Sequence, residues 1–342
     1  MLKYIAVLVL YVSVLQTHGQ DVQYSQFYGS NILMNPAFAG ATKFARVTAF
    51  QRMQWSNISG KTLSSAVAFD RYFYDYKIGL GGSLQYDRLA SGVLNNISVG
   101  PSVSYLVLNT QKQFLRLGLG ANYVNKKYTT QSLVFADQLD ANFGQILSQS
   151  TDTYAQTNYS KSYLDLNLGA LYNTKNFWIG ASVSHLNKPA QSLEANTIKT
   201  PRKIHIHSGY KFIFKDQRGL AIQKESHLSL AANVKNQGTA TQADLGVYYV
   251  KNMFCVGLWY RGIPLINSKN GYINQDALTP LIGFENRGFR IGYSYDITIS
   301  KLGYQTGGSH ELSMTWDFGD VSDKRKKKPG KMKTMYMPYP KL

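Results

Sequence analysis

The segment that decides the fold is IGLGGSLQYD, residues 78–87. Every second residue from Ile78 to Tyr86 is apolar or glycine, and the residues between them, from Gly79 to Asp87, are small or polar. Residues two apart in a β-strand lie on the same face, so the segment predicts a strand with one apolar and one polar face.

The same alternation recurs along the chain, for example over 115–123, 164–170, 290–297 and 311–318. Most of these segments have the roughly 9–11 residues that a tilted strand needs to cross a membrane. The complete pattern predicts about fourteen strands, at residues 42–52, 61–71, 77–87, 94–107, 113–125, 161–173, 176–186, 203–214, 225–235, 240–250, 253–262, 278–285, 289–297 and 309–318.

The connectors between these segments alternate in length. Every second connector is usually short and rich in turn-forming residues, as at 109–112, 173–176, 251–252 and 285–288. The intervening connectors are mostly longer, notably 126–160, 187–202 and 263–277, although 215–224 is long for its place in the series. Short turns at one end, longer loops at the other and an even strand number are typical of outer-membrane barrels.

Composition separates a membrane barrel from a soluble β-sandwich, which also alternates. Charged residues make up 16% of the chain, against about 25% in soluble proteins, and there are 25 tyrosines. The polar faces are rich in Gly, Ser and Asn rather than in Lys, Glu and Thr, and tyrosine concentrates at lipid–water boundaries. We therefore expect an all-β, transmembrane antiparallel barrel over residues 42–318, in which closure pairs the backbone groups.

The beginning of the chain reads as an export signal. Lys3 precedes the apolar run 5–15, and Thr17 and Gly19 form a small-x-small cleavage site before Gln20. We expect residues 1–19 to be a cleaved signal peptide. Residues 20–41 then form an N-terminal extension without strand-length alternation, expected to fold against or into the barrel mouth.

The chain ends in a basic tail, residues 319–342, which holds eight Lys or Arg against two acids. Two interpretations stay open: a solvated, disordered tail, or a periplasmic tail that docks on an acidic partner or on anionic lipid. The expected docking residues are Lys324, Arg325, Lys326, Lys327 and Lys328. The net charge is +18, but an exported protein rarely meets nucleic acid, so nucleic acid is not expected as a partner.

No candidate for chemistry is convincing. His205 and His207 share a strand face and could bind a metal, but no third ligand is near, which favours hydrogen bonding in the lumen. Ser309, His310 and Glu311 are triad residue types, yet neighbouring strand residues point to opposite faces. The Gly-x-Gly pairs at 79–81 and 118–120 lie inside strands, where close packing or barrel curvature explains them better than phosphate binding.

Isolated charges fall on the face expected to point inward. They could line a water-filled pore or pair across a filled interior, and pairing is favoured because buried charges need partners. These residues are Asp70, Asp87, Arg116, Asp165, Asp244, Arg261, Arg290, Asp296, Glu311 and Asp317.

Motifs at both ends of the mature chain resemble those of the PorP/SprF family of the type IX secretion system of Bacteroidota. The motifs are Gln23-Tyr24-Ser25-Gln26-Phe27, Asn35-Pro36-Ala37-Phe38-Ala39-Gly40, Arg52-x-Gln54-Trp55, Phe289-Arg290-Ile291-Gly292-Tyr293-Ser294-Tyr295-Asp296 and Gly308-Ser309-His310-Glu311-Leu312-Ser313. The expected family-motif residues, with roles in positioning and packing, are Asn35, Pro36, Gly40, Arg52, Trp55, Arg290, Tyr293, Asp296, His310 and Glu311.

The resemblance implies an integral outer-membrane barrel that is not an enzyme and carries no cofactor. Family members support export or surface attachment of particular cargo proteins, including gliding adhesins, and associate with periplasmic ring components. On this reading the external loops 126–160, 187–202 and 263–277 hold a cargo C-terminal domain. The alternatives are a diffusion porin or small-solute channel and, less favoured, a barrel enzyme such as a lipase.

Overall fold

The computed structural model describes residues 21–320 except 27, 28, 30, 111, 131–132, 140–149, 153–154, 156–158, 192–198, 215–225, 268–272 and 302. The expected signal peptide and its cleavage site, the basic run from Lys324 to Lys328 and the whole of connector 215–224 lie outside the described residues.

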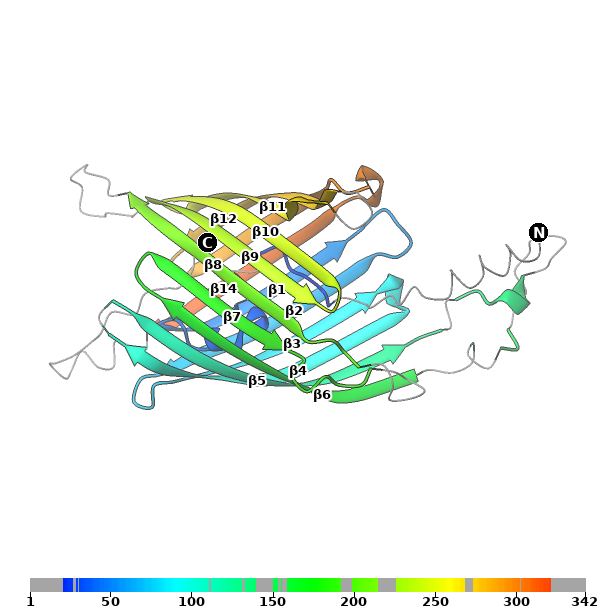
Figure 1. The fold of residues 1–342 in the computed structure, drawn as a ribbon, viewed down its shortest axis with the longest axis horizontal. Coiled ribbons are helices and arrows are strands. Elements are labelled where there is room, and N and C mark those ends of the chain that lie inside the picture. The colour runs from blue at the N-terminus through cyan, green and yellow to red at the C-terminus, as the bar shows by residue number, and fades with distance from the viewer. Residues whose placement is uncertain are drawn as a thin grey trace.

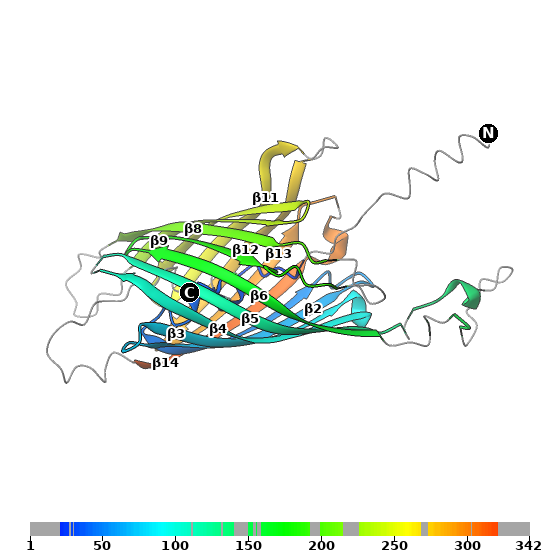
Figure 2. The ribbon, with the colours of Figure 1, turned by 60° about the horizontal axis from the view of Figure 1, so that its bottom comes forward.

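Fourteen antiparallel strands form one closed barrel (Figures 1 and 2). Each strand pairs with its neighbours in sequence, and β1 pairs with β14 to close the sheet. The strands are β1 Phe44–Gln54, β2 Thr62–Phe73, β3 Ile78–Leu89, β4 Leu94–Asn109, β5 Phe114–Tyr128, β6 Tyr159–Asn173, β7 Phe177–Ser184, β8 Lys203–Phe214, β9 Ser226–Gln237, β10 Ala240–Lys251, β11 Phe254–Asn267, β12 Ile273–Asn286, β13 Phe289–Thr298 and β14 Ser309–Asp320.

Among the described residues, helical structure is confined to short elements: α2 Asn31–Met34, η1 Pro36–Phe38, η2 Ala90–Gly92, η3 Ala136–Gln138 and η4 Tyr304–Thr306. Within the described part of the chain, no helix has the length and apolar character required to cross a membrane.

The predicted barrel and its strand number are confirmed. The prediction for one connector was wrong. The loop expected at 263–277 is mostly strand, because β11 extends to Asn267 and β12 starts at Ile273. The register of the ladder between these strands shifts between Arg261 and Gly262 and again between Ile263 and Asn267. A bulged pairing breaks the two-residue alternation, so the sequence pattern stopped short of the strand ends.

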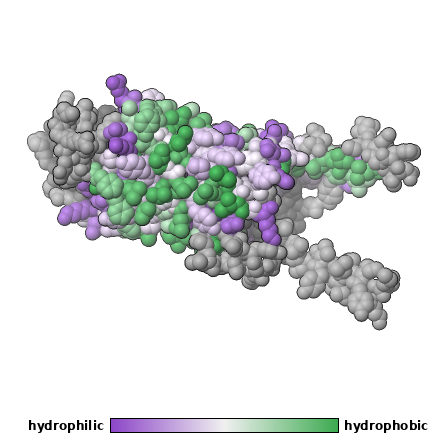
Figure 3. Space-filling view, turned by 90° about the horizontal axis from the view of Figure 1, so that it is seen from above, coloured by the Kyte–Doolittle hydropathy of each residue, from purple (hydrophilic) through white to green (hydrophobic). Residues whose placement is uncertain are grey.

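The outer face of the barrel is apolar and the inner face is polar, as the alternation predicts. On β3, Leu80 and Leu84 are 46% and 50% exposed on the outer face, whereas Asp87 is buried on the inner face. A hydrophobic band crosses the outer surface, with hydrophilic residues toward both ends (Figure 3). All ten charged residues expected to point inward are buried. The arrangement is that of a barrel with lipid outside and a filled, polar interior.

The barrel has two distinct ends. The end with the short connectors 74–77, 110–113, 174–176, 252–253 and 287–288, where β1 begins and β14 finishes, is here named the turn end. The opposite end, which carries the connectors 129–158 and 185–202, is named the loop end. The connectors 129–158 and 185–202 therefore lie at the opposite end from the start of β1 and the end of β14, whereas the long connector 215–225, between β8 and β9, belongs to the turn end.

Candidate functional site: a lumen filled by the N-terminal segment

Residues 21–41, named the plug, run through the inside of the barrel, where α2 appears as a dark blue coil (Figure 1). At the loop end, the Asp21 carboxylate lies 3.1 Å from Lys203 Nζ. At the turn end, the Gly40 amide donates to Asp70 Oδ2 over 2.9 Å. The extension expected against or into the barrel mouth therefore passes along the whole lumen and enters β1 at the turn end.

The centre of the plug is shaped by Asn35 and Pro36. Asn35 is extended and accepts a hydrogen bond from the Ala37 amide at its Oδ1, over 2.9 Å, which caps η1. Pro36 occupies the first helical position, where its missing N–H costs nothing and its fixed φ suits the turn. The Asn-Pro pair therefore bends the chain between α2 and η1.

The Asn35 amide also ties the plug to the barrel wall. Its Nδ2 donates to the carbonyls of Ala170 and Ala181, at 3.0 and 3.2 Å. These carbonyls belong to β6 and β7, and Asn35 itself is fully buried. Ser182 Oγ adds a bond to the Met34 carbonyl over 2.8 Å. A buried amide with all these partners fixes the plug in one register.

Strand glycines make room for the plug. A Cβ placed on Gly79 would lie 2.0 Å from the Ala39 carbonyl oxygen, and one on Gly118 would lie 2.2 Å from the Ala37 nitrogen. A Cβ on Gly169 would meet Asn35 Oδ1 at 2.0 Å. Close packing against the plug, rather than phosphate binding, thus accounts for these positions.

A charged cluster clamps the start of the plug to the wall and is named the clamp: Arg52, Arg261, Asp296 and Glu311. Arg52 bridges two strands, with Asp296 at 2.7 Å and Glu311 at 3.0 Å, and Arg261 lies 2.9 Å from Asp296. All four side chains are buried.

Backbone groups of the plug complete the clamp. Glu311 accepts the amide protons of Ser25 and Gln26, each over 2.7 Å. Ser25 Oγ donates to Asp296 and accepts from Arg52 and Arg261, at 2.8 and 2.9 Å. A buried carboxylate with two amide donors and a guanidinium is well compensated for the water it has lost.

A separate ion pair network lies near the turn end. Asp317 pairs with Arg46 at 2.8 Å and with Arg290 at 3.0 Å, from three neighbouring strands. Arg116 packs over the Tyr72 ring at 4.7 Å. Most of the lumenal charges thus pair inside the barrel, the interpretation that the sequence favoured over an open pore.

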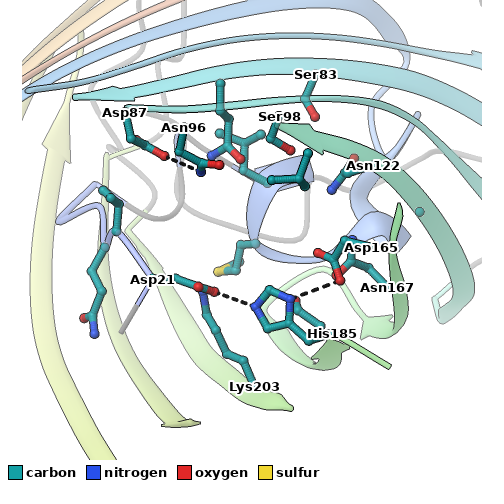
Figure 4. Close-up of a pocket in the computed structure, with 18 of the residues that line it drawn as sticks. Asp21, Ser83, Asp87, Asn96, Ser98, Asn122, Asp165, Asn167, His185 and Lys203 are labelled. Carbon is teal, nitrogen blue, oxygen red and sulfur yellow. Dashed lines mark hydrogen bonds and ion pairs between the residues drawn. The ribbon is translucent and has the colours of Figure 1, made fainter. Parts of the chain in front are cut away.

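At the loop end a third cluster holds the first described residue. His185 lies between two carboxylates, 3.0 Å from Asp165 and 2.9 Å from Asp21 (Figure 4). Burial alone would lower the pKa of His185, but hydrogen bonds and charge from Asp165 and Asp21 raise it to about 9. Burial opposes ionisation of Asp21, yet Lys203 and His185 hold the pKa of Asp21 well below its usual value.

The structure brings together only part of the set of family-motif residues. Arg52, Asp296 and Glu311 meet in the clamp, whereas Tyr293 and His310 lie on the outer face, where Tyr293 Oη is 2.8 Å from His310 Nδ1. Trp55 stands at the loop end with a φ of 59°, and its amide bonds the Gly308 carbonyl over 2.8 Å.

The residue types suited to catalysis or metal binding do not converge. Ser309 and Glu311 face the lumen, while His310 lies outside. His207 stacks on Phe38 of the plug at 5.3 Å, and His205 bonds Asn233. No group of three or more metal-ligating side chains occurs among the residues that the structure describes.

Sequence reasoning missed the partners of the clamp on the plug. Ser25 and Gln26 were noticed only as part of a motif, and His185 was not singled out. The sequence did contain a signal. Ser25 and Gln26 are hydrogen-bonding residues that stand between two aromatic residues, in a segment without strand alternation. Their targets lie about 290 positions away, at Glu311 for example, so only the barrel closure reveals the pairing.

The family model described as "Type IX secretion system membrane protein PorP/SprF" matches residues 16–316, most of the chain. The chain belongs to the PorP/SprF family. The resemblance seen in the motifs is thereby confirmed, and a membrane barrel of this family fits an outer-membrane location in the type IX secretion system.

Solved outer-membrane barrels resemble this PorP/SprF chain in outline. The toluene transporter TodX of Pseudomonas putida superimposes with a TM-score of 0.46 at 10% identity, covering 83% of this chain and 92% of TodX. A FadL homologue of Pseudomonas aeruginosa gives a TM-score of 0.42 at 10% identity, covering 83% and 93%. A search of curated proteins found no match.

Proposed function

We propose that this PorP/SprF protein is a non-enzymatic outer-membrane component that supports export or surface attachment of particular cargo proteins, such as gliding adhesins. One observation carries the proposal: the plug runs through the lumen and is bonded to the wall at Ser25, at Asn35 and at Gly40. A barrel filled by its own chain serves cargo from its surface rather than as a conduit.

The orientation of the barrel follows from its connectors. Outer-membrane barrels place short turns and both termini of an even-stranded sheet in the periplasm. The turn end then faces the periplasm, and the loop end faces the exterior. The connectors 129–158 and 185–202 are thereby available to hold a cargo C-terminal domain outside the cell.

A second contact of the protein, on the periplasmic side, involves the basic tail. The chain leaves β14 at Asp320, at the turn end, and continues into the basic run Lys324 to Lys328. An electrostatic contact with acidic ring components or with anionic lipid would weaken as salt is raised. Export by a cleaved leader, residues 1–19, belongs to the same proposal.

Loop deletion tests the cargo role. The variant replaces residues 131–157 by a short Gly-Ser linker, and the tagged protein is purified from mild-detergent outer membranes for mass spectrometry. We expect the full chain, and not the deletion, to bring down a large exported surface protein. A variant lacking only residues 321–342 is the control, because it keeps the loop and should keep the cargo.

The porin alternative makes an opposite prediction in planar bilayers. A diffusion porin conducts ions steadily and binds no cargo, whereas a plugged barrel conducts poorly. Deleting residues 21–40 should raise the conductance of purified barrels. Steady conductance by the full chain, with no protein partner recovered, would refute the proposal in favour of a channel.

A further inference from the structure

The strand β6 has an edge that is left unpaired at the loop end. It is 15 residues long against 8 in β7, and it extends beyond β7 on that side of the barrel (Figure 1). Its ladder with β7 runs only from Leu168 to Asn173, whereas its ladder with β5 continues as far as Tyr159. Residues 159–165 therefore have β5 on one side and, within the described part of the chain, no strand on the other.

The chain turns away from this edge soon after β7 ends. His185 and Lys188 have positive φ angles of 56° and 46°, which end the extended path beside β6. The His185 side chain bonds Asp21 inside the lumen, and Gln191, further along, lines a cavity inside the barrel at the loop end. The described part of this connector is therefore drawn over the lumen and does not pair with residues 159–163 of β6.

The side chain of Asn187 shows which backbone groups point outward from the edge. Its Oδ1 accepts the Leu166 amide over 3.2 Å, and its Nδ2 donates to the Leu164 carbonyl over 2.7 Å, as a neighbouring strand would. Backbone groups of alternate residues point to the same side of an antiparallel strand, so Ser160 and Ser162 face this edge too. Neither serine has a backbone partner on that side among the described residues. An open edge of this kind is a template for pairing with another chain.

The unpaired edge lies beyond the lipid. On the outer face, Tyr123 and Leu164 are 52% and 53% exposed, and they are the last large apolar side chains of their strands toward the loop end. Beyond them the outward side chains are polar, and Asn125 Nδ2 donates to the hydroxyls of Ser160 and Ser162, at 2.9 and 2.8 Å. A tyrosine at this change of polarity is typical of the boundary between lipid and water. A strand added to the edge would therefore lie in water.

We propose that this edge binds, by addition of a β-strand, an extended segment of the cargo C-terminal domain. The inference rests on the proposed secretion role and deepens it by naming the contact. The edge lies at the loop end, which the proposed orientation places outside the cell. It also continues directly from the connector 129–158, proposed above to hold cargo, since β6 begins at Tyr159. Backbone hydrogen bonds supply the affinity in this mode of recognition.

A second copy of the chain does not fit this edge. In a two-fold pair within one membrane, the two β6 strands tilt in opposite directions and cross at about 70–90°. Neighbouring strands of a sheet differ by only about 20–25°, so strands that cross so steeply cannot form a ladder. An extended segment of a partner outside the membrane has no such constraint.

The test compares two substitutions at one position in the full-length, tagged protein. Ser162→Pro removes an N–H that faces the open edge and no hydrogen bond of the barrel, and edge strands tolerate such a proline. Ser162→Ala is the matched control, because it changes the side chain and keeps the N–H. The readout is the amount of the exported surface protein that copurifies from mild-detergent outer membranes, identified by mass spectrometry. We expect Ser162→Pro to recover at least about tenfold less than Ser162→Ala.

Hydrogen exchange gives a second measurement that needs no substitution. We expect the amides of Ser160 and Ser162 to exchange rapidly in the barrel alone and at least about tenfold more slowly in the complex with the copurified protein. Slow exchange in the barrel alone would mean that another segment of the chain, or a second copy, covers the edge, and would overturn the proposal.

The recovery experiment separates failure of this inference from failure of the proposed function. Unheated gel mobility checks that each variant is folded, and Ser160→Pro with Ser160→Ala provides a second pair at the same edge. If deletion of residues 131–157 abolishes recovery but the folded proline variants recover as much as their alanine controls, the secretion role stands and the edge proposal is overturned. If the unchanged chain recovers no exported protein, both are overturned.

Discussion

At the scale of single residues, Glu311 is the centre of the clamp. It accepts the amides of Ser25 and Gln26 and pairs with Arg52 in a buried site. Glu311→Gln removes the charge while keeping the size of the side chain, so it leaves Arg52 less well compensated. We expect a loss of about 3 kcal/mol in the free energy of unfolding, measured by urea titration in lipid vesicles.

The control for this variant is Glu285→Gln, since Glu285 is half-buried and forms no salt bridge with a described residue. It should change the unfolding midpoint little. Equal losses for the two variants would contradict the role of the clamp.

Also at the residue scale, His185 makes stability depend on pH. Its pKa is raised from 6.5 to about 9, a shift that corresponds to about 3 kcal/mol. This contribution is fully present below pH 6.5 and is lost as pH rises through about 9. We expect the urea midpoint of unfolding to fall between pH 7 and 9.5. The midpoint of the His185→Gln variant should fall less over the same interval.

Asp21 makes stability depend on pH in the opposite sense, at acid pH. The pKa of Asp21 is lowered, so its contribution to stability is present above about pH 3.8 and is lost as pH falls through the pKa in the folded protein.

For His185, the contradicting outcome is a His185→Gln variant whose urea midpoint changes with pH in parallel with that of the unchanged chain over pH 7 to 9.5. That result would exclude His185 as the origin of the alkaline loss of stability.

At the scale of elements, the plug packs closely against β5 because Gly118 has no side chain. Gly118→Val places atoms where the Ala37 backbone lies, and this backbone cannot move without disturbing η1. We expect the variant to displace the plug, raising both bilayer conductance and protease cleavage within residues 21–41. Gly82→Val is the matched control, because the nearest atom to a Cβ there is 3.7 Å away and should leave conductance low. Unchanged conductance in folded Gly118→Val would argue against a plug held by close packing.

At the scale of the whole molecule, the path of the plug sets the topology. The chain has Asp21 at the loop end and Asp320 at the turn end, so the two ends of the described chain lie on opposite sides of the barrel. We expect an epitope tag inserted after Gln20 to be labelled by antibody on intact cells. A tag after Leu342 should be labelled only after the outer membrane is permeabilised. The reverse labelling pattern would invert the orientation proposed here.

Most of the barrel was predictable, because alternation is local: each strand shows its apolar and polar faces within about ten residues. The inward positions of Asp296 and Glu311 follow from the same pattern, whereas Arg52 was not among the charges expected to point inward. The extra length of β11 and β12 did not follow, since an irregular pairing interrupts the two-residue period. The sequence predicted paired charges in the lumen but not which charges pair, because that depends on the register of strands far apart in the chain.

The sequence by itself determined the membrane barrel, its fourteen strands and its family, since these rest on short-range periodicity and on motifs. The tertiary structure alone decided that residues 21–41 pass through the lumen, that Ser25 meets Glu311, and that Gly118 faces Ala37. Each of these contacts joins residues far apart in sequence, and the free energy that holds them comes from burying and pairing groups that meet only when the barrel closes.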